Sequence, residues 1–83
     1  MKPKLLIVDD DEAIRIQTKW ALSQDYDVCL AEDRKGAVEA FEANSPAVTL
    51  LDLGLPPRPN ECDEGMAALS EILAIDSDAK III

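Results

Sequence analysis

The chain has 83 residues, 48% of them hydrophobic and 30% charged, and its formal net charge at pH 7 is −9. This composition is typical of one small globular domain and not of a disordered tail. The negative charge would repel a phosphate backbone, so we do not expect this segment to bind nucleic acid directly. Its apolar runs are far shorter than the ~20 residues of a membrane span, and the first is too short for a signal peptide, so a cytoplasmic protein with no membrane contact is predicted.

The sequence predicts short strands that alternate with helices. The strands are apolar runs of the kind that parallel sheets bury on both faces, and they lie at residues 4–8, 27–31, 47–52 and 80–83. The helices repeat apolar residues at helical spacing, and they lie at residues 12–24, 34–44 and 64–75. Proline and glycine mark residues 53–65 as a long loop that runs into the last helix.

Each predicted helix has an apolar face that we expect to pack on the sheet. In chain order these faces are Ala13, Ile14, Ala21 and Leu22, then Ala37, Val38 and Phe41, then Met66, Leu69, Ile72 and Leu73. Strands that alternate with helices require crossover connections, which are right-handed in nearly all proteins. The pattern therefore predicts an α/β fold, a doubly wound parallel sheet in the order β-α-β-α-β-α-β with helices on both faces.

Four acidic residues, Asp9 to Glu12, follow the first predicted strand without interruption. Like charges at this range repel one another and raise each other's pKa, so local stability alone would not select this run. Asp11, with Glu12 in the first turn, fits the N-cap of the first helix. Capping needs only one residue, so Asp9 and Asp10 require another explanation.

A further aspartate, Asp52, ends the third predicted strand. Ligands of open parallel sheets bind outside the carboxyl ends of the strands, so Asp9, Asp10 and Asp52 are expected to converge there. Asp52 by itself would fit a turn before Gly54. Three carboxylates with no lysine or arginine adjacent in the sequence form an oxygen-rich site suited to Mg²⁺. A magnesium-dependent hydrolase would also use such a site, although the sequence has no Walker loop.

The two cysteines predict neither a disulfide nor a zinc site. Cys29 and Cys62 lie far apart, and the chain has no histidine. We expect Cys29 in the core and Cys62 in the polar loop, where Arg58 is its nearest basic neighbour in the sequence. Both are expected to be reduced thiols.

Two stretches closely resemble the receiver domain of bacterial two-component response regulators. They are LLIVDDDEAIR at residues 5–15 and VTLLDLGLP at residues 48–56. The resemblance spans the whole chain and combines the acidic pair, the aspartate that ends the third strand and the proline that follows it at Pro56. It implies a flavodoxin-like fold in which these strands take the sheet order 2-1-3-4.

The resemblance also implies a role for each site residue. Asp52 matches the phosphoacceptor nucleophile, which takes a phosphoryl group from a phosphohistidine on a partner sensor histidine kinase. Asp10 matches a direct ligand of Mg²⁺, Asp9 a neighbour that acts through metal-bound water, and the backbone carbonyl of Gly54 a further protein ligand. The implied function is a phosphorelay switch, not a classical enzyme, that controls an output domain of the parent protein and through it transcription.

One alternative is a receiver-like interaction module that is not phosphorylated. Such a module would be expected to lose one of Asp9, Asp10 or Asp52, and all three are present. The loop after Asp52 departs from the family because it is longer before the glycine that aligns with Gly65. This longer loop is similar to that of a subgroup of regulators from exopolysaccharide and protein-sorting gene clusters. In that subgroup a sigma-54-dependent activator module follows the receiver domain.

The end of the chain is the larger departure from the family. The signalling Ser or Thr at the end of strand four and the lysine at the end of strand five would fall beyond Ile83. We therefore expect residues 1–83 to form the N-terminal two thirds of a five-stranded receiver domain, without its fourth helix, fifth strand and fifth helix. Residues 80–83 would then form an exposed sheet edge, which predicts association through that edge, including as a homodimer.

Overall fold

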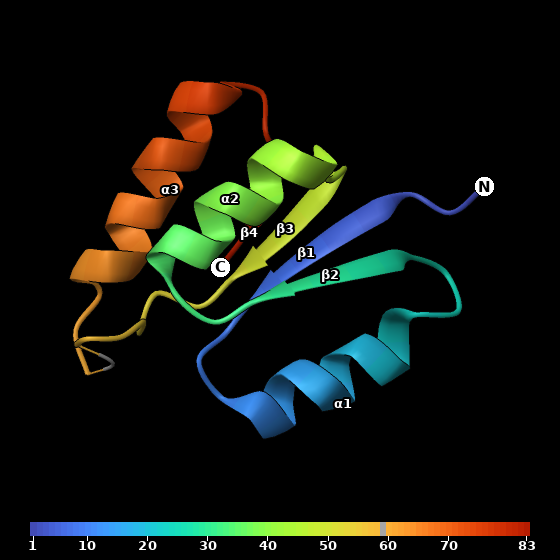
Figure 1. Ribbon diagram of the computed structural model, residues 1–83, viewed down its shortest axis with the longest axis horizontal. Coiled ribbons are helices and arrows are strands. Elements are labelled where there is room, and N and C mark those ends of the chain that lie inside the picture. The colour runs from blue at the N-terminus through green and yellow to red at the C-terminus, as the bar shows by residue number, and fades with distance from the viewer. Residues whose placement is uncertain (59) are drawn as a thin grey trace.

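The computed structural model describes residues 1–58 and 60–83, in which strands and helices alternate (Figure 1). The elements are β1 (Lys4–Val8), α1 (Glu12–Leu22), β2 (Asp27–Ala31), α2 (Arg34–Asn44), β3 (Val48–Leu51), α3 (Asp63–Ile75) and β4 (Ile81–Ile82). All strand pairs are parallel, and the sheet order is β2-β1-β3-β4. The predicted α/β fold with its sheet order 2-1-3-4 is confirmed.

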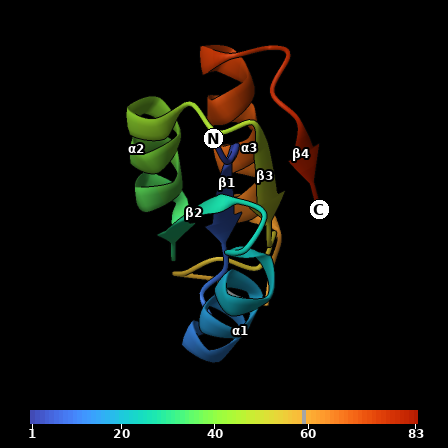
Figure 2. The same cartoon turned by 90° about the vertical axis from the view of Figure 1, so that its right-hand side faces the viewer.

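Helices cover both faces of the sheet, with α1 on one side and the pair α2 and α3 on the other (Figures 1 and 2). Successive side chains of β1 point to opposite faces, as the pleat of a strand requires. Leu6 and Val8 join the core cluster beneath α2 and α3, and Leu5 and Ile7 are equally buried, at 2% and 3% exposed. A strand buried on both faces explains the continuous apolar run in the sequence.

The main core lies between the sheet and the α2–α3 pair. Ala37 and Phe41 of α2 are buried there, as predicted, and pack with Leu51 and Leu55. The predicted face of α3 is only partly correct, because Met66 and Leu73 are 45% and 37% exposed. The residues that α3 buries are Gly65, Ala68 and Ile72.

The predicted apolar face of α1 is also only partly used. Across Glu12–Leu22, all of which the structure describes, no side chain is fully buried, and Ile14 is 47% exposed. The half-buried residues are Arg15, Thr18 and Leu22. The strands that α1 packs against are β1 and β2, so its outward apolar side chains have little to pack against.

The long loop between β3 and α3 is fixed at both ends. Leu55 is fully buried in the core, and the Gly65 backbone N–H donates to the Leu53 carbonyl at 3.2 Å. A Cβ on Gly65 would overlap the Leu53 backbone, so only glycine allows this approach. The close contact fixes the residue that follows Asp52. Within the predicted loop, Pro59 lies outside the described residues.

The last strand, β4, pairs with β3 and lies at the outer edge of the sheet (Figure 2). Ile82 and Ile83 are 59% and 69% exposed, which agrees with the expected exposed edge. Association through this edge stays a prediction. None of the helices in the described part of the chain has the length and apolar character needed to cross a membrane.

Thr49 on β3 provides a test of the packing. Its side chain is 0% exposed, and its hydroxyl has no hydrogen-bond partner among the described residues. A buried unpaired polar group costs about 1–3 kcal/mol, and valine has nearly the same shape without the hydroxyl. We expect Thr49→Val to raise the free energy of unfolding by about 1 kcal/mol in urea titrations.

Thr18→Val on α1 is the matched control, because Thr18 is only half-buried. We expect this variant to change the free energy of unfolding by less than about 0.5 kcal/mol. A destabilised Thr49→Val protein would show that the hydroxyl is paired in solution.

Candidate functional site

The register of three strands brings the acidic residues to one edge of the sheet. Val8 of β1 lies opposite Ala31 of β2 and Leu51 of β3. The next residues continue these ladders, because the Asp9 N–H donates to the Ala31 carbonyl at 3.1 Å and the Asp52 N–H to the Val8 carbonyl at 2.9 Å. The main chain at Asp9 and Asp52 is therefore fixed by the sheet itself.

Asp9, Asp10 and Asp52 converge at this edge. Each offers a carboxylate oxygen, and these oxygens all lie within 4.8 Å of one another. Asp9 is half-buried, whereas Asp10 is exposed. The structure thus brings together the three aspartates that the sequence singles out, and their chemical roles stay predictions.

Local hydrogen bonds orient two of these carboxylates. Asp9 Oδ1 accepts from the Asp11 N–H at 2.9 Å, and Asp52 Oδ1 accepts from the Gly54 N–H at 3.0 Å. Asp11 is the predicted N-cap of α1, since its Oδ1 accepts from the N–H groups of Ala13 and Ile14. Oδ1 of Asp9 and Oδ1 of Asp52 are thereby bonded within the protein. The second oxygen of each carboxylate is left to bind a ligand.

The electrostatics of the cluster favour a bound cation. The pKa of Asp9 is raised above its ordinary value, first by burial and then by the charges of Asp52, Asp10 and Asp11, although the Asp11 N–H opposes the shift. Within the described residues, no ion pair of 4.0 Å or less joins a lysine or arginine to Asp9, Asp10 or Asp52.

The donor set fits a hard divalent cation. Carboxylate oxygens without nitrogen or sulfur donors are the ligands that Mg²⁺ prefers, usually with several waters retained. Asp9, Asp10 and Asp52 supply such oxygens within 4.8 Å of one another. Asp52 also presents a carboxylate that can act as a nucleophile beside the cation. The predicted ligand role of the Gly54 carbonyl stays a prediction.

Sequence reasoning missed Arg15, which contacts the site through the main chain. Its Nη1 donates to the Asp9 carbonyl at 2.7 Å, and its Nη2 lies 3.6 Å from Glu32 Oε2. The side chain of Arg15 is only 14% exposed. The available signal was its position one helical turn after Asp11, which returns it to the end of β1.

The structure also shows the cap of α2 and the surroundings of the two cysteines. Asp33 caps α2, because its Oδ1 accepts from the Gly36 N–H at 2.7 Å, and its place before an apolar helix could have indicated this. Cys29 is half-buried against the core, and burial raises the pKa of its thiol, whereas Cys62 is exposed. Both cysteines are free, as predicted.

A family model and several known proteins match this chain. Residues 5–83 match the family model described as the response regulator receiver domain. The chemotaxis protein CheY of Bacillus subtilis is 34% identical over 84 residues, which cover 99% of this chain and 66% of CheY. The transcriptional regulatory protein KdpE of Staphylococcus aureus is 38% identical over 73 residues, which cover 87% of this chain and 29% of KdpE.

Solved structures agree with the sequence matches. The response regulator TrrA of Thermotoga maritima, solved in complex with Mg(2+)-BeF, has a TM-score of 0.84 at 31% identity, covering 100% of this chain and 68% of TrrA. The signal receiver domain of a putative LuxO repressor protein from Vibrio parahaemolyticus has a TM-score of 0.83 at 27% identity, covering 100% of this chain and 61% of that one. The chain thus spans about two thirds of these domains and less than a third of KdpE.

Asp9→Asn is expected to stabilise the metal-free protein at neutral pH. Because the folded-state pKa of Asp9 is raised, the folded state holds this proton more tightly than the unfolded state does. Ionisation of Asp9 therefore lowers stability as the pH rises above the ordinary value of 3.8. Asparagine removes that cost and keeps Oδ1 for the Asp11 N–H. We expect a gain of about 0.5–1 kcal/mol, since solvent screens the site.

Urea unfolding with a chelator at a series of pH values measures this effect. The difference between Asp9→Asn and wild type should be small below pH 3.8, grow as the pH rises and then level off. Asp25→Asn, at an exposed position beyond α1, should show no such trend. A loss of stability in Asp9→Asn at neutral pH would contradict the electrostatic account.

Proposed function

The chain belongs to the receiver domains of response regulators, and we propose that it is a phosphorelay switch whose phosphoacceptor is Asp52. Receiver domains serve two-component signalling as regulatory domains and not as classical enzymes. The observation that carries the proposal is the convergence of Asp9, Asp10 and Asp52 within 4.8 Å at one edge of the sheet. A carboxylate nucleophile beside two further carboxylates is the arrangement that phosphoryl transfer through a bound cation needs.

Magnesium is the proposed cation. Asp10, Asp52 and the Gly54 carbonyl would bind it directly, and Asp9 would act through a bound water. The all-oxygen donor set supports this choice. Among the described residues, no lysine or arginine forms an ion pair of 4.0 Å or less with Asp9, Asp10 or Asp52, which also supports it. When bound, Mg²⁺ would offset the negative charge of the phosphoryl group during transfer.

The proposed reaction is direct transfer to Asp52 from a phosphohistidine. An oxygen of the Asp52 carboxylate attacks the phosphorus, the new O–P bond forms, and the N–P bond breaks as the imidazole nitrogen keeps the electron pair. The hydrogen bond from the Gly54 N–H to Asp52 Oδ1 limits rotation of the carboxylate before attack. The product is an acyl phosphate, whose lability suits a reversible signal.

The parent protein is proposed to be longer than this chain. We propose that residues 1–83 are the N-terminal two thirds of the receiver domain, followed by a fourth helix, a fifth strand and a fifth helix. The coverage of 66% of CheY and 68% of TrrA supports this proposal. We also propose that the protein is cytoplasmic, that a sensor histidine kinase is its phosphoryl donor, and that an output domain that regulates transcription is the target of the switch.

Magnesium binding is tested by calorimetry on the folded chain. We expect measurable Mg²⁺ binding in the wild type, and a loss of at least about tenfold in affinity in Asp10→Ala, because a direct carboxylate ligand is removed. Asp11→Asn is the matched control, since asparagine also caps helices and Asp11 already uses its side chain in the cap. Equal affinities in wild type and Asp10→Ala would contradict the assignment.

Phosphorylation is tested on the full-length parent protein with acetyl phosphate and Mg²⁺. We expect one added phosphoryl group by intact mass, labile to base as an acyl phosphate is, and none in Asp52→Asn. Asp63→Asn removes one carboxylate at the exposed start of α3 and should label like the wild type. If the wild type binds Mg²⁺ but takes no phosphoryl group, the chain is an interaction module and the switch proposal is wrong.

A further inference from the structure

Arg15 connects the carboxyl ends of two strands beside the acidic cluster. From α1 its guanidinium donates through Nη1 to the Asp9 carbonyl at 2.7 Å and lies 3.6 Å from Glu32, which follows β2. The Arg15 side chain is 14% exposed, whereas that of Glu32 is 70% exposed. The donor of this hydrogen bond is charged, and charge-assisted bonds are about twice as strong as neutral ones.

With this bond, the described contacts hold Asp9 at three points. Its N–H donates to the Ala31 carbonyl at 3.1 Å, its carbonyl accepts from Arg15, and its Oδ1 accepts from the Asp11 N–H at 2.9 Å. The first contact belongs to the sheet and the third to the turn that starts α1. Among the described side chains, Arg15 is the one that ties the peptide between Asp9 and Asp10 to the helix, and this peptide sets the direction of the Asp10 side chain.

We propose that Arg15 is a positioning residue for the acidic cluster, which holds the Asp9–Asp10 peptide so that both carboxylates face one divalent cation. The inference rests on the proposed function, because the cation is the Mg²⁺ of that site. Arg15 acts through the Asp9 carbonyl and not through a carboxylate. Its nearest charged partner within 4.0 Å, among the described residues, is Glu32.

A positioning role and a neutralising role predict opposite effects of removing Arg15. If Arg15 only neutralised the cluster, its loss would leave the site more negative and Mg²⁺ would bind more tightly. If Arg15 fixes the Asp9–Asp10 peptide, its loss would loosen the ligands, and Mg²⁺ would bind more weakly despite the added negative charge. The sign of the change therefore distinguishes the two roles.

The surroundings of Arg15 favour a folded but looser variant. A surface hollow of about 510 Å³ lies beside it, lined by Glu32, Asp33, Lys35 and Glu39 among others. Arg15 itself lines the hollow, so we expect water to fill the space that a shortened side chain leaves and to reach the Asp9 carbonyl. Water does not restrain the peptide as a guanidinium fork does.

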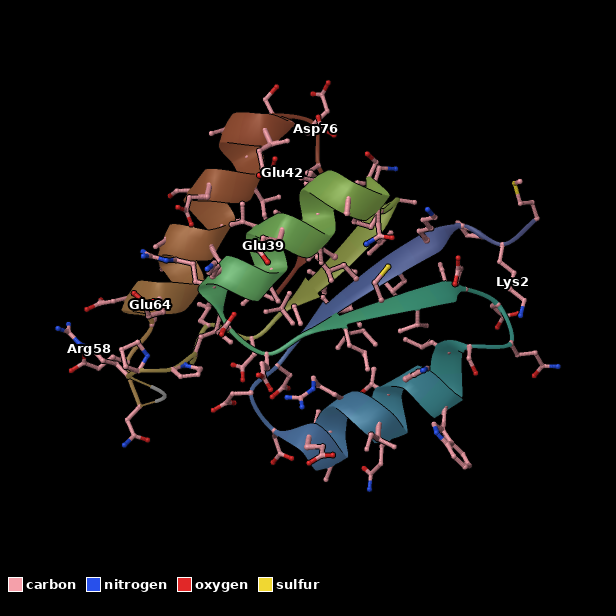
Figure 3. All side chains as sticks on the ribbon, viewed as in Figure 1. Lys2, Glu39, Glu42, Arg58, Glu64 and Asp76 are labelled. Carbon is pink, nitrogen blue, oxygen red and sulfur yellow. The ribbon has the colours of Figure 1, made fainter. Side chains whose placement is uncertain are left out.

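The experiment compares Mg²⁺ affinity, measured by calorimetry, in wild type, Arg15→Ala, Arg15→Lys and Arg58→Ala. Arg58 is the matched control because it also forms ion pairs, with Glu61 and Asp63, but lies in the β3–α3 loop away from α1 (Figure 3). We expect Arg15→Ala to bind Mg²⁺ about 5–20-fold more weakly, because contacts that hold metal ligands in place typically have effects of this order on affinity. The Mg²⁺ affinity of Arg15→Lys should be intermediate, because lysine keeps the positive charge but lacks the planar guanidinium fork. Arg58→Ala should bind like the wild type.

Amide hydrogen exchange without Mg²⁺ gives a readout that does not depend on the metal. In Arg15→Ala the hydrogen-bonded amides of Asp9 and Asp11 should exchange faster, whereas the amides of Val48–Leu51 in β3 should keep their rates. A uniform rise across the chain would show global destabilisation and would overturn the positioning role. If Arg15→Ala does not fold, the same measurements on Arg15→Lys test the positioning role.

The outcomes separate this inference from the proposed function. A wild type that binds no Mg²⁺ would refute the metal site, while amide exchange at Asp9 and Asp11 would still test the anchoring by Arg15. A wild type that binds Mg²⁺, together with equal or tighter binding and unchanged exchange in Arg15→Ala, would overturn the positioning role and leave the proposed function standing.

Discussion

The parallel register of β1 with β2 and β3 is the constraint on which the site depends. Val8 lies opposite Ala31 and Leu51, so the residues that follow these positions meet at one edge. A slip of one residue would turn the buried side chains of β1 to the opposite faces and would also separate Asp9 from Asp52. Because the side chains of β1 are buried on both faces, the core strongly favours this register. The core packing therefore fixes the spacing of the acidic side chains.

The site is an unfavourable arrangement that the rest of the fold sustains. The half-buried Asp9 has a raised pKa, and two more carboxylates lie beside it. Main-chain hydrogen bonds hold Asp9 and Asp52 there, and Gly65 packs closely against Leu53, the residue after Asp52. Functional sites commonly break local rules of stability in this way. The negative charge that makes these carboxylates repel one another also attracts a cation.

The two faces of the sheet differ in how completely they are covered. Beneath α2 and α3 the core is closed, with Leu6 and Ile72 both at 0% exposed. On the other face, α1 leaves Trp20 at 78% exposed, and at the sheet edge Ile82 of β4 is 59% exposed. Apolar side chains on α1 and β4 are therefore more exposed than those in the core beneath α2 and α3. The residues of the acidic cluster directly follow β1 and β3, the two central strands of this four-stranded sheet.

The sequence by itself determined the order of strands and helices, the doubly wound sheet, the Asp11 cap and the acidic residues that meet at the strand ends. These features follow from the period of apolar residues and from topology, which are local or general properties of chains. Tertiary structure alone decided that Arg15 bonds the Asp9 carbonyl and that α3 buries Ala68 in place of Met66. A helical period shows which residues share a face, but the elements packed against the helix decide how far that face is turned toward the core. A side chain such as Arg15 acquires its partner only when separate elements meet in space.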